Sequence, residues 1–504
     1  MLELWFMSFI AEGSLLLVGP LWRARRFLAA LITVLILVTS GWLVVQLGLF
    51  LAVPFGLLAV FRGGNMLRIV KNRMHAQYLK QSTGRTSLRL FFLHPLAVVL
   101  LILYFTLLGS SYTQGFAVLQ LAVAAAILAI VTRNIYKLRY KPPDTFLPDR
   151  ELPTVTVAIP ARNESTDLQE CLRTVLANDY PKLEIIVLDD CSQGKTAEII
   201  KSFAQDGVRF VQGEPPAERW LAKNQAYQQL YRETSGDLVL FCGADARFGP
   251  HAIRSMVNLL AARKKTMLSV LPVRSQSSLA DAFFQPMRYW WELALPRRLF
   301  NKPSVLGTCW MIDRDDLKRY GGFAAVSHTI LPEGYFAREL VKTDKYSFVR
   351  SSGELEVKTA KNFHQQYASA IRNRYPQIRR RPEWALIITV INVLFLLLPF
   401  VFLAASIWAA SINPLVAGLT CLLLVIAHVS IVNITDPANS LLALLSFPVA
   451  AFSELAVGYA SMIQYEFFTV AWKDRNICIP VMHVIPRLPS LDEEKSRVQT
   501  SSSK

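Results

Sequence analysis

The chain of 504 residues is 53% hydrophobic and only 18% charged, a composition that excludes an ordinary soluble enzyme and predicts a membrane protein. The formal net charge is +17, and the basic residues lie mainly beside the apolar blocks. This is the positive-inside placement that is typical of membrane proteins. Because the basic residues form no aromatic-interleaved groove and the six cysteines show no CxxC spacing, we expect no nucleic-acid partner and no zinc site.

Residues 1–140 predict an N-terminal membrane region with about three to four crossings. The apolar run from Phe27 to Phe61 is longer than one crossing needs, and it fits either one tilted helix or a tight pair. The runs 90–108 and 116–131 predict a helical hairpin. Since basic residues flank these runs, we expect the domain that follows to lie on the cytoplasmic side.

Residues 150–350 predict an α/β domain, which the chain enters through a proline-punctuated linker. The segments 154–159, 185–188 and 238–241 are apolar and rich in β-branched residues, as in strands that are buried on both faces. Consecutive βα units imply a mainly parallel sheet with right-handed crossovers. Ligands bind outside the carboxyl ends of such strands, so the acidic residues there should face one crevice. These residues are Glu164, Asp189, Asp190 and Asp245.

Aromatic residues cluster between positions 280 and 300, with Phe283, Trp291 and Leu295 at helical spacing. One interpretation is an interfacial helix that lies on the membrane with its aromatic face among the lipid head groups. The alternative is a core helix of the α/β domain. The residues favour neither interpretation.

The C-terminal part divides into three segments. Residues 351–384 form a linker with an interfacial basic segment, residues 385–464 a second membrane region, and residues 465–504 a cytoplasmic or disordered tail. A break at residues 411–414 splits the first apolar run of this membrane region into two crossings.

The last apolar block, Leu441 to Met462, contains Pro448 and Glu454. If this block spanned the membrane, the charged tail after it would lie outside, in conflict with the basic residues there. A re-entrant or interfacial segment would keep that end of the chain cytoplasmic. Both alternatives stay open from the sequence.

Five stretches carry a resemblance to a known family, in their order and spacing as well as in their letters. They are IPARNE (159–164), LDDCSQGKT (188–196), RWLAKNQA (219–226), GDLVLFCGADARF (236–248) and LGTCWMIDRDDLKRYGGF (306–323). They resemble family 2 nucleotide-sugar glycosyltransferases, and within that family the membrane-bound branch of ceramide glucosyltransferases and bacterial carotenoid-ester (diaponeurosporenoate) glycosyltransferases. The resemblance implies a GT-A domain, Rossmann-like with a mainly parallel sheet, inserted between transmembrane α-helical regions.

The resemblance also implies a site for a nucleotide-sugar donor, most simply a UDP-linked one. A carboxylate can accept hydrogen bonds from ribose hydroxyls and the uracil N–H, and a lysine supplies a mobile charge for the diphosphate. The residues that match the family's donor site are Pro160, Arg162, Glu164, Asp189, Asp190, Lys223 and Asn224.

The third strand ends where the family has an Asp-x-Asp motif, but here Gly243 stands in place of the first aspartate. The resemblance assigns a Mg²⁺ or Mn²⁺ ion to the remaining carboxylate, Asp245. Mg²⁺ needs only one or two protein carboxylates when diphosphate oxygens complete its shell.

The run from Leu331 to Arg338 matches the stretch that carries the family's catalytic base, and Glu333 occupies the position of that base. A partly desolvated carboxylate can take a proton from a hydroxyl as that hydroxyl attacks the anomeric carbon. Trp291, Trp310 and His328 are the predicted acceptor contacts, although a lone loop histidine is usually structural or solvated.

The chain lacks the QxxRW motif of processive synthases, and the sequence stretches most similar to that motif are residues 364–367 and 372–375. We therefore predict an inverting hexosyltransferase that moves one sugar from a nucleotide-diphosphate donor to a membrane lipid or isoprenoid. It would be an integral protein of a bacterial plasma membrane with its catalytic domain in the cytoplasm. A synthase for a cell-surface polysaccharide and a non-catalytic scaffold derived from a transferase remain as alternatives.

Overall fold

The computed structural model describes residues 25–46 and most of 110–476, together with isolated residues between positions 4 and 67. The gaps in the second range are 145, 218–219, 276–277, 285–286, 296–302, 408–411, 468–469 and 474. The chain divides into two compact units: Met1–Phe92 with Cys478–Lys504, and Leu93–Ile477.

In the first unit the described structure centres on helix α2 (Arg25–Gln46), whose apolar part runs from Phe27 to Trp42. Arg62 is buried there with its Nε 2.7 Å from the Glu12 carboxylate. Most of the predicted apolar run after α2, and most of the predicted run 90–108, lie outside the described residues.

The second unit contains a seven-stranded sheet in the order β3-β2-β1-β4-β8-β6-β9. Strand β8 is antiparallel to its two neighbours, and the other neighbouring pairs of this sheet are parallel. The predicted fold class, a mainly parallel α/β domain flanked by apolar helices, is confirmed. The strands are β1 (Val155–Ala161), β2 (Leu183–Asp189), β3 (Val208–Gln212), β4 (Leu238–Cys242), β6 (Met267–Leu271), β8 (Cys309–Asp313) and β9 (Tyr346–Arg350).

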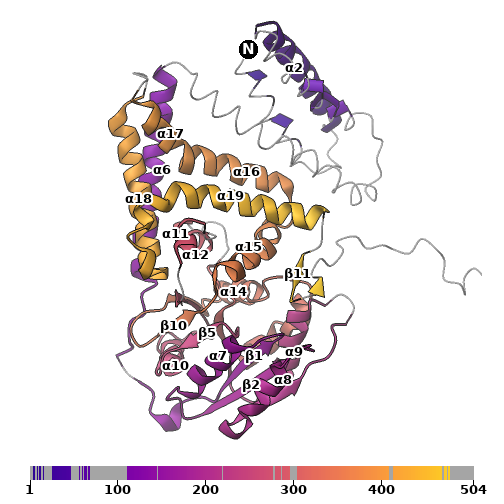
Figure 1. Ribbon diagram of the computed structural model, residues 1–504, viewed down its shortest axis with the longest axis vertical. Helices are drawn as coiled ribbons and strands as arrows, with labels where there is room; N and C mark the ends of the chain where they lie inside the picture. Colours follow the sequence, from indigo (N-terminus) through magenta and orange to yellow (C-terminus); the bar gives the residue numbers. More distant parts are fainter. Residues whose placement is uncertain are drawn as a thin grey trace, which may run out of the picture. The chain divides into compact units, whose positions relative to one another are not determined.

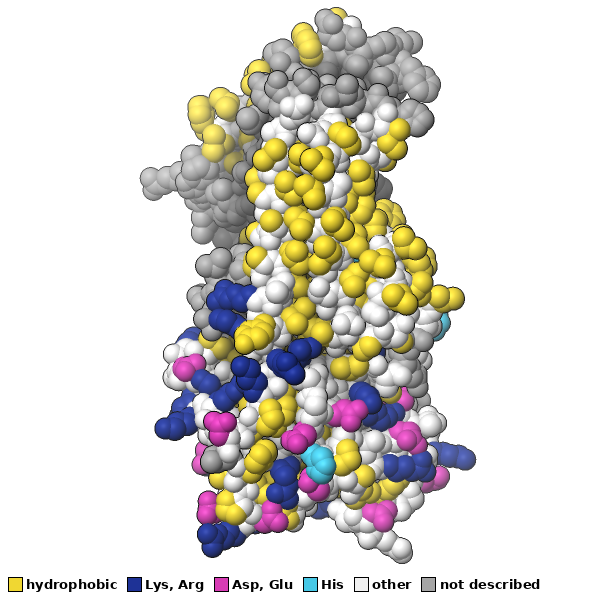
Figure 2. Space-filling view, turned by 90° about the vertical axis from the view of Figure 1, so that its left-hand side faces the viewer, with side chains coloured by type: hydrophobic (Ala, Val, Ile, Leu, Met, Phe, Trp, Pro, Cys, Tyr) yellow, Lys and Arg dark blue, Asp and Glu magenta, His cyan; other side chains and the backbone are white. Residues whose placement is uncertain are grey.

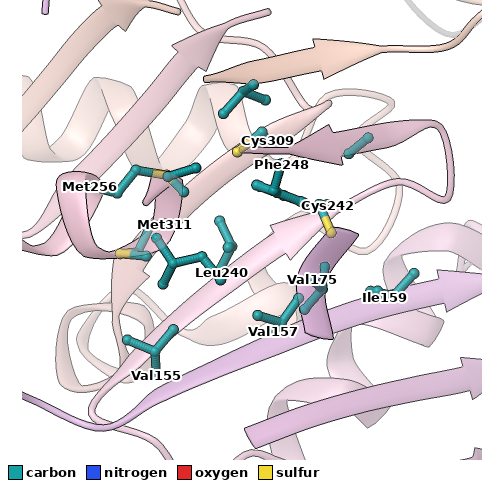
Figure 3. Close-up of a cluster of buried hydrophobic side chains, with 14 of the residues drawn as sticks. Val155, Val157, Ile159, Val175, Leu240, Cys242, Phe248, Met256, Cys309 and Met311 are labelled. Carbon is teal, nitrogen blue, oxygen red and sulfur yellow. The ribbon is translucent and has the colours of Figure 1, made fainter. Parts of the chain in front are cut away.

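Helices cover both faces of this sheet because successive strand residues point to opposite sides. Val155 and Val157 of β1 pack into one core with Leu240 and Met256, as Figure 3 shows, while Ala158 packs into the core on the other face. The helices of the domain are α7 (Thr166–Leu176), α8 (Thr196–Ser202), α9 (Ala222–Glu233), α10 (Ala252–Ala262), α13 (Arg314–Arg319) and α14 (Glu333–Lys342). A small sheet of β5 (Ala246–Phe248), β10 (Val357–Thr359) and β7 (Val273–Arg274) adjoins them.

Four helices among the described residues are long and apolar enough to cross a membrane: Thr113–Lys137, Ile387–Ala405, Pro414–Thr435 and Ala443–Glu466. Their outer surface is apolar, as the exposed Leu415, Leu422 and Ile426 show. Figure 2 shows hydrophobic side chains over these helices and charged ones over the α/β domain. The helices are α6 (Ser110–Lys137), α16 (Pro382–Asn392), which continues through the π-helical turn Val393–Leu397 into α17 (Leu398–Ala405), α18 (Pro414–Thr435) and α19 (Ala443–Phe467).

Helix α19 is tied by hydrogen bonds near both of its ends to segments that precede it in the chain. Just before it, Asn439 donates to the Ser278 carbonyl at 3.2 Å, and near its end Glu466 accepts from the Tyr375 hydroxyl at 2.8 Å. In Figure 1 it runs beside α16 and across the direction of α18.

Glu454 ties the middle of α19 to the domain. Its carboxylate lies 2.7 Å from Nε of Arg374 on α15 (Phe363–Gln377) and accepts from Nη2 of the same residue at 3.0 Å. It also accepts from the Met287 N–H at 2.8 Å and the Trp291 indole N–H at 3.2 Å. The carboxylate and guanidinium are both largely buried, so each depends on the other for its compensating charge.

The aromatic segment forms two short helices, α11 (Leu279–Phe284) and α12 (Arg288–Ala294). Trp290 and Leu293 are buried against residues of α6, α18 and α19. The segment therefore lies at the junction between the α/β domain and the apolar helices, a position that neither interpretation of the sequence specified.

Replacing Glu454 with alanine should lower the free energy of unfolding by about 3–5 kcal/mol, because it leaves the Arg374 guanidinium buried without a counter-charge. The measurement is thermal or chemical unfolding of the purified protein in detergent. The matched control is Glu339→Ala, which breaks a solvent-facing pair with Lys342 and should change stability by about 1 kcal/mol or less. Equal losses in the two variants would contradict this role of Glu454.

Candidate active site

The loops after β1 and β2 hold each other in place. Asn163, at a positive φ of 45°, donates its N–H to the Ser192 hydroxyl, and its side-chain oxygen accepts from the Gln193 N–H. The Glu164 N–H donates to the Thr196 hydroxyl at 2.9 Å, and that hydroxyl donates back to the Glu164 carbonyl. Two of the motif stretches therefore form one rigid rim at the carboxyl edge of the sheet.

A cavity of about 290 Å³ lies over this edge. The end of β1 and the residues just after β4 contribute to its wall, and so do the residues just before β8, because an antiparallel strand begins where its parallel neighbours end. Helices α9, α14 and α15 complete the wall. The charged side chains that line the cavity include Glu164, Lys223, Asp245, Glu333, Arg372 and Lys473.

Glu333, the predicted base, is the first residue of α14 and is only 1% exposed. Within the described residues its Oε2 has no hydrogen-bond partner, although the residue lines the cavity. Gly307 allows this placement, since a Cβ there would lie 2.5 Å from Oε1. The carboxylate is thus buried and close to the backbone, with an oxygen left for a ligand.

Asp245, the predicted metal ligand, also lines the cavity. Its Oδ2 accepts from the Thr359 hydroxyl at 2.9 Å and lies 3.5 Å from the Lys361 amine. Burial acts to raise the pKa of this carboxyl, but Lys361 and the Thr359 hydroxyl outweigh burial and hold the pKa below its usual value. Asp245 is therefore charged at neutral pH.

Gly243 has a steric role next to Asp245. A Cβ at Gly243 would lie 2.6 Å from Oδ1 of Asp245, so the carboxylate occupies the space into which a side chain at position 243 would extend. The glycine in place of the first motif aspartate thus matches the observed orientation of Asp245.

The donor set fits a divalent cation only in part. No group of three or more His, Cys, Asp and Glu side chains suited to a metal exists among the described residues. Asp245 offers one charged carboxylate to the cavity, which suits an ion such as Mg²⁺ that takes most of its ligands from diphosphate oxygens and water. Asp245 is thus the residue that would hold the ion.

A hairpin that follows α19 reaches the rim of this cavity. It consists of β11 (Ala471–Trp472) and β12 (Arg475–Asn476), and Lys473 in its turn lies 3.0 Å from the Glu164 carboxylate. Burial is the largest influence on Glu164 and raises its pKa against the opposing effect of Lys473. The predicted donor residue Glu164 thus already has an ion-pair partner.

Asp189 and Asp190 are buried and are not among the cavity-lining residues. Arg475 of the hairpin donates from Nη1 to both carboxylate oxygens of Asp190, at 2.7 and 2.8 Å. Asp189 accepts from the Ser192 N–H at 3.3 Å. The structure therefore does not bring these two predicted donor carboxylates to the surface of the cavity.

Two other predicted donor residues hold the backbone in place. Arg162 donates from Nη1 to the carbonyls of Asp190 and Cys191, and from Nε to the Lys473 carbonyl. Asn224 is 1% exposed, and its amide donates to three carbonyls between residues 326 and 329. Asn224 lines the cavity and Arg162 does not. The hydrogen bonds of both side chains position the surrounding backbone, and their direct contact with a donor stays a prediction. Pro160 and Lys223 line the cavity as predicted.

None of the three predicted acceptor contacts lines the cavity. Trp291 bonds to Glu454, away from the cavity wall. Trp310 is fully buried and stacks between the rings of Phe241 and Phe336. His328 is exposed and bonds to the neighbouring Ser327 hydroxyl. Trp310 thus serves the core, as an aromatic residue in a motif can. The role of these three residues as acceptor contacts stays a prediction.

Sequence reasoning missed the wall that α15 provides. Its cavity-facing residues are spaced i, i+3, i+4, i+7 and i+8, the stripe of one helical face. Burial lowers the pKa of the Arg372 guanidinium, one of this stripe. Helical periodicity could have identified the stripe, whereas the hairpin residues lie too far along the chain for spacing to connect them to the site. The stripe consists of Gln365, Ala368, Ser369, Arg372 and Asn373.

A mainly parallel sheet with a charged cavity over the carboxyl ends of its strands defines an α/β domain of the class that binds ligands at this edge. Residues 156–321 match the family model described as glycosyl transferase family 2. The chain therefore carries a family 2 glycosyltransferase domain, as its motifs predicted.

Similar proteins include the probable glycosyltransferase YdaM of Bacillus subtilis, 35% identical over 100 residues that cover 19% of this chain and 24% of that protein. A 4,4'-diaponeurosporenoate glycosyltransferase of Staphylococcus haemolyticus is 29% identical over 121 residues, or 24% of this chain and 32% of that protein. The chain thus spans less than a third of the length of these relatives. A similar solved structure is the mannosyltransferase PcManGT from Pyrobaculum calidifontis, with 19% identity, a TM-score of 0.41, and coverage of 69% of this chain and 97% of that chain.

Replacing Glu164 with glutamine should raise the melting temperature at pH 7. Because burial raises the pKa of Glu164, the native state binds more protons than the unfolded state between pH 4.5 and the native pKa. Stability therefore falls as pH rises through that interval, and glutamine removes this loss.

The measurement is the melting temperature of both proteins from pH 4 to pH 8. The advantage of the variant should disappear toward the acid end, where Glu164 is protonated in both states. A lower melting temperature of Glu164→Gln at pH 7 would mean that the Lys473 pair outweighs the cost of burial.

Proposed function

We propose that this protein is an inverting glycosyltransferase that moves a single sugar from a nucleotide-diphosphate donor, UDP-linked in the first instance, to a membrane lipid or isoprenoid acceptor. One observation carries this proposal: a single cavity joins Glu333, whose Oε2 has no partner among the described residues, to Asp245 and Lys223. A base and a diphosphate site in one cavity are what glycosyl transfer needs.

On the donor side, Lys223 supplies a mobile positive charge for the diphosphate from the start of α9. A divalent cation held at Asp245, when bound, would offset the negative charge that develops on the departing diphosphate. Lys361, Arg372 and Lys473 add positive charge to the cavity wall. A cavity with this charge suits a ligand with several phosphate oxygens.

On the acceptor side, Glu333 takes the proton of an acceptor hydroxyl as its oxygen attacks the anomeric carbon. The new C–O bond forms on one face of the sugar while the bond to the diphosphate breaks on the other, so the anomeric configuration inverts. One base suffices for this single displacement. The burial of Glu333 keeps water from competing for its carboxylate, which favours proton transfer from the acceptor.

A membrane acceptor is supported by the two faces of α15. One face lines the cavity, and the other carries Arg374, which pairs with Glu454 of α19. An acceptor head group that lies along α15 would thus remain beside apolar helices that suit its hydrocarbon part. The similar protein from Staphylococcus haemolyticus is named for a carotenoid acid acceptor, which agrees with this class of substrate. We also propose an integral bacterial plasma-membrane location with the domain in the cytoplasm, because basic residues flank the apolar runs of the sequence.

The synthase of a cell-surface polysaccharide is the nearest alternative, because it would use the same donor and a similar fold. The absence of QxxRW favours a single transfer. A non-catalytic scaffold is the second alternative. The unpartnered oxygen of the buried Glu333 argues against it, because such an atom is costly unless a ligand uses it.

The test is transfer of labelled sugar from UDP-sugars to lipids in membranes that contain the wild-type protein or Glu333→Gln. We expect the wild type to yield lipids with one added sugar by mass spectrometry, and the variant to lose at least about 100-fold in turnover because it cannot accept the proton. A ladder of products would support the polysaccharide alternative, and unchanged turnover of Glu333→Gln would contradict the base assignment.

Replacing Gly307 with alanine should lower kcat at least about tenfold, because the new methyl group would displace the Glu333 carboxylate from its position. Gly334→Ala is the matched control. A Cβ at position 334 meets only a Val305 methyl at 3.8 Å, an ordinary contact, so turnover should be retained. Equal effects of the two alanines on kcat would argue against the close approach of Gly307 to the base.

A further inference from the structure

The hairpin Ala471–Asn476 holds the rim of the donor site from outside the α/β domain. Arg475 binds both carboxylate oxygens of Asp190, and its Nη2 also donates to the Asp190 carbonyl at 3.2 Å. Lys473 pairs with Glu164 and donates to the Asn163 carbonyl at 3.3 Å. These bonds join residues about 280 to 310 positions apart, so they form only when the hairpin is docked.

Arg475 pairs with Asp190, a residue that the sequence predicts to bind the nucleoside of the donor. A guanidinium N–H that bonds to a carboxylate occupies the position that a ring N–H of uracil or guanine would take. Both oxygens of Asp190 lie within 2.8 Å of one Arg475 nitrogen. A base cannot reach this carboxylate while Arg475 stays in place.

We propose that the hairpin is a strap that occupies the nucleoside position and that a nucleotide donor must displace Arg475 from Asp190 in order to bind. The proposal rests on the proposed function and on the family resemblance of the motifs, which assigns Asp190 to the nucleoside of the donor. It also gives the strap a part in donor selection. Uracil and guanine offer Asp190 a ring N–H as a replacement for the guanidinium donor, whereas adenine and cytosine offer only exocyclic amino N–H groups at a different position on the ring.

The position of the strap in the chain determines where the strap stays after a donor has displaced it. The hairpin begins four residues after the end of α19, and α19 packs against α15, which lines the cavity. A strap displaced by the donor therefore stays attached beside the wall along which we place the acceptor. Release of the strap would clear the donor position and leave the attachment to α19 unchanged.

The first experiment measures UDP binding by calorimetry in the presence of Mn²⁺, with the full-length protein in detergent. Arg475→Gln should bind UDP at least about tenfold more tightly than the wild type, because the nucleotide no longer competes with a charge-assisted pair. Simple electrostatics gives the opposite expectation, since the variant has lost a positive charge near an anion. Weaker or unchanged binding by Arg475→Gln would overturn the proposal.

Arg254→Gln is the matched control, because Arg254 pairs with Asp149 and Asp179 away from the cavity. Its affinity for UDP should equal that of the wild type. ADP is the control nucleotide and should show little difference between wild type and Arg475→Gln. If neither the wild type nor Arg475→Gln binds UDP or GDP, both the proposed function and the strap proposal are contradicted. If the two proteins bind UDP equally, the proposed function is retained and only the strap proposal is contradicted.

The second experiment needs no variant. Trypsin cleaves after lysine and arginine, so Lys473 and Arg475 report directly on whether the strap is docked. Cleavage at these two positions in the wild type, located by mass spectrometry, should become faster when UDP and Mn²⁺ are added and should not respond to ADP. Protection by UDP would show that the hairpin closes over the nucleotide, which would overturn the proposal.

Discussion

The structure of the site depends on carboxylates that are buried at one edge of the sheet and must each be compensated. A buried charge without a partner is costly, so every such group needs a cation, a set of hydrogen bonds or a ligand. Asp245 has Lys361 and the Thr359 hydroxyl, Asp190 has Arg475, and Glu164 has Lys473. Glu333 differs because one of its oxygens has no described partner. This difference distinguishes Glu333, which is suited to accept a proton, from the other three carboxylates, which are suited to binding.

The compensating cations come from segments outside the central βα units. Lys361 follows β10, and Lys473 and Arg475 follow α19, although the carboxylates they meet stand directly after β1, β2 and β4. The α/β domain and the apolar helices are therefore not independent parts. The carboxylate rim is complete only when the chain beyond α19 has returned to the domain.

The sequence predicted the sheet because strand formation depends on the residues that are adjacent in the chain. Alternating β-branched residues placed β1, β2 and β4, and the strand ends placed Glu164 and Asp245 beside one cavity. The same patterns could not show that Arg475 covers Asp190, because a contact across 285 residues leaves no trace in spacing. They also could not separate a core aromatic from a ligand contact, as Trp310 shows. Family motifs located the site, and long-range packing decided which motif residues reach it.

Helix α15 connects the cavity with the apolar helices because it contributes residues to both surfaces. Its stripe through Ser369 and Arg372 faces the cavity, and one or two residues later Arg374 faces Glu454 of α19. Because successive helical residues are separated by about 100° around the axis, a single helix can serve both surfaces. Both arginines are largely buried, and Arg374 pairs with Glu454, whereas no acidic side chain among the described residues forms an ion pair with Arg372. Arg372 lines the cavity, so its charge is available there to an anionic ligand.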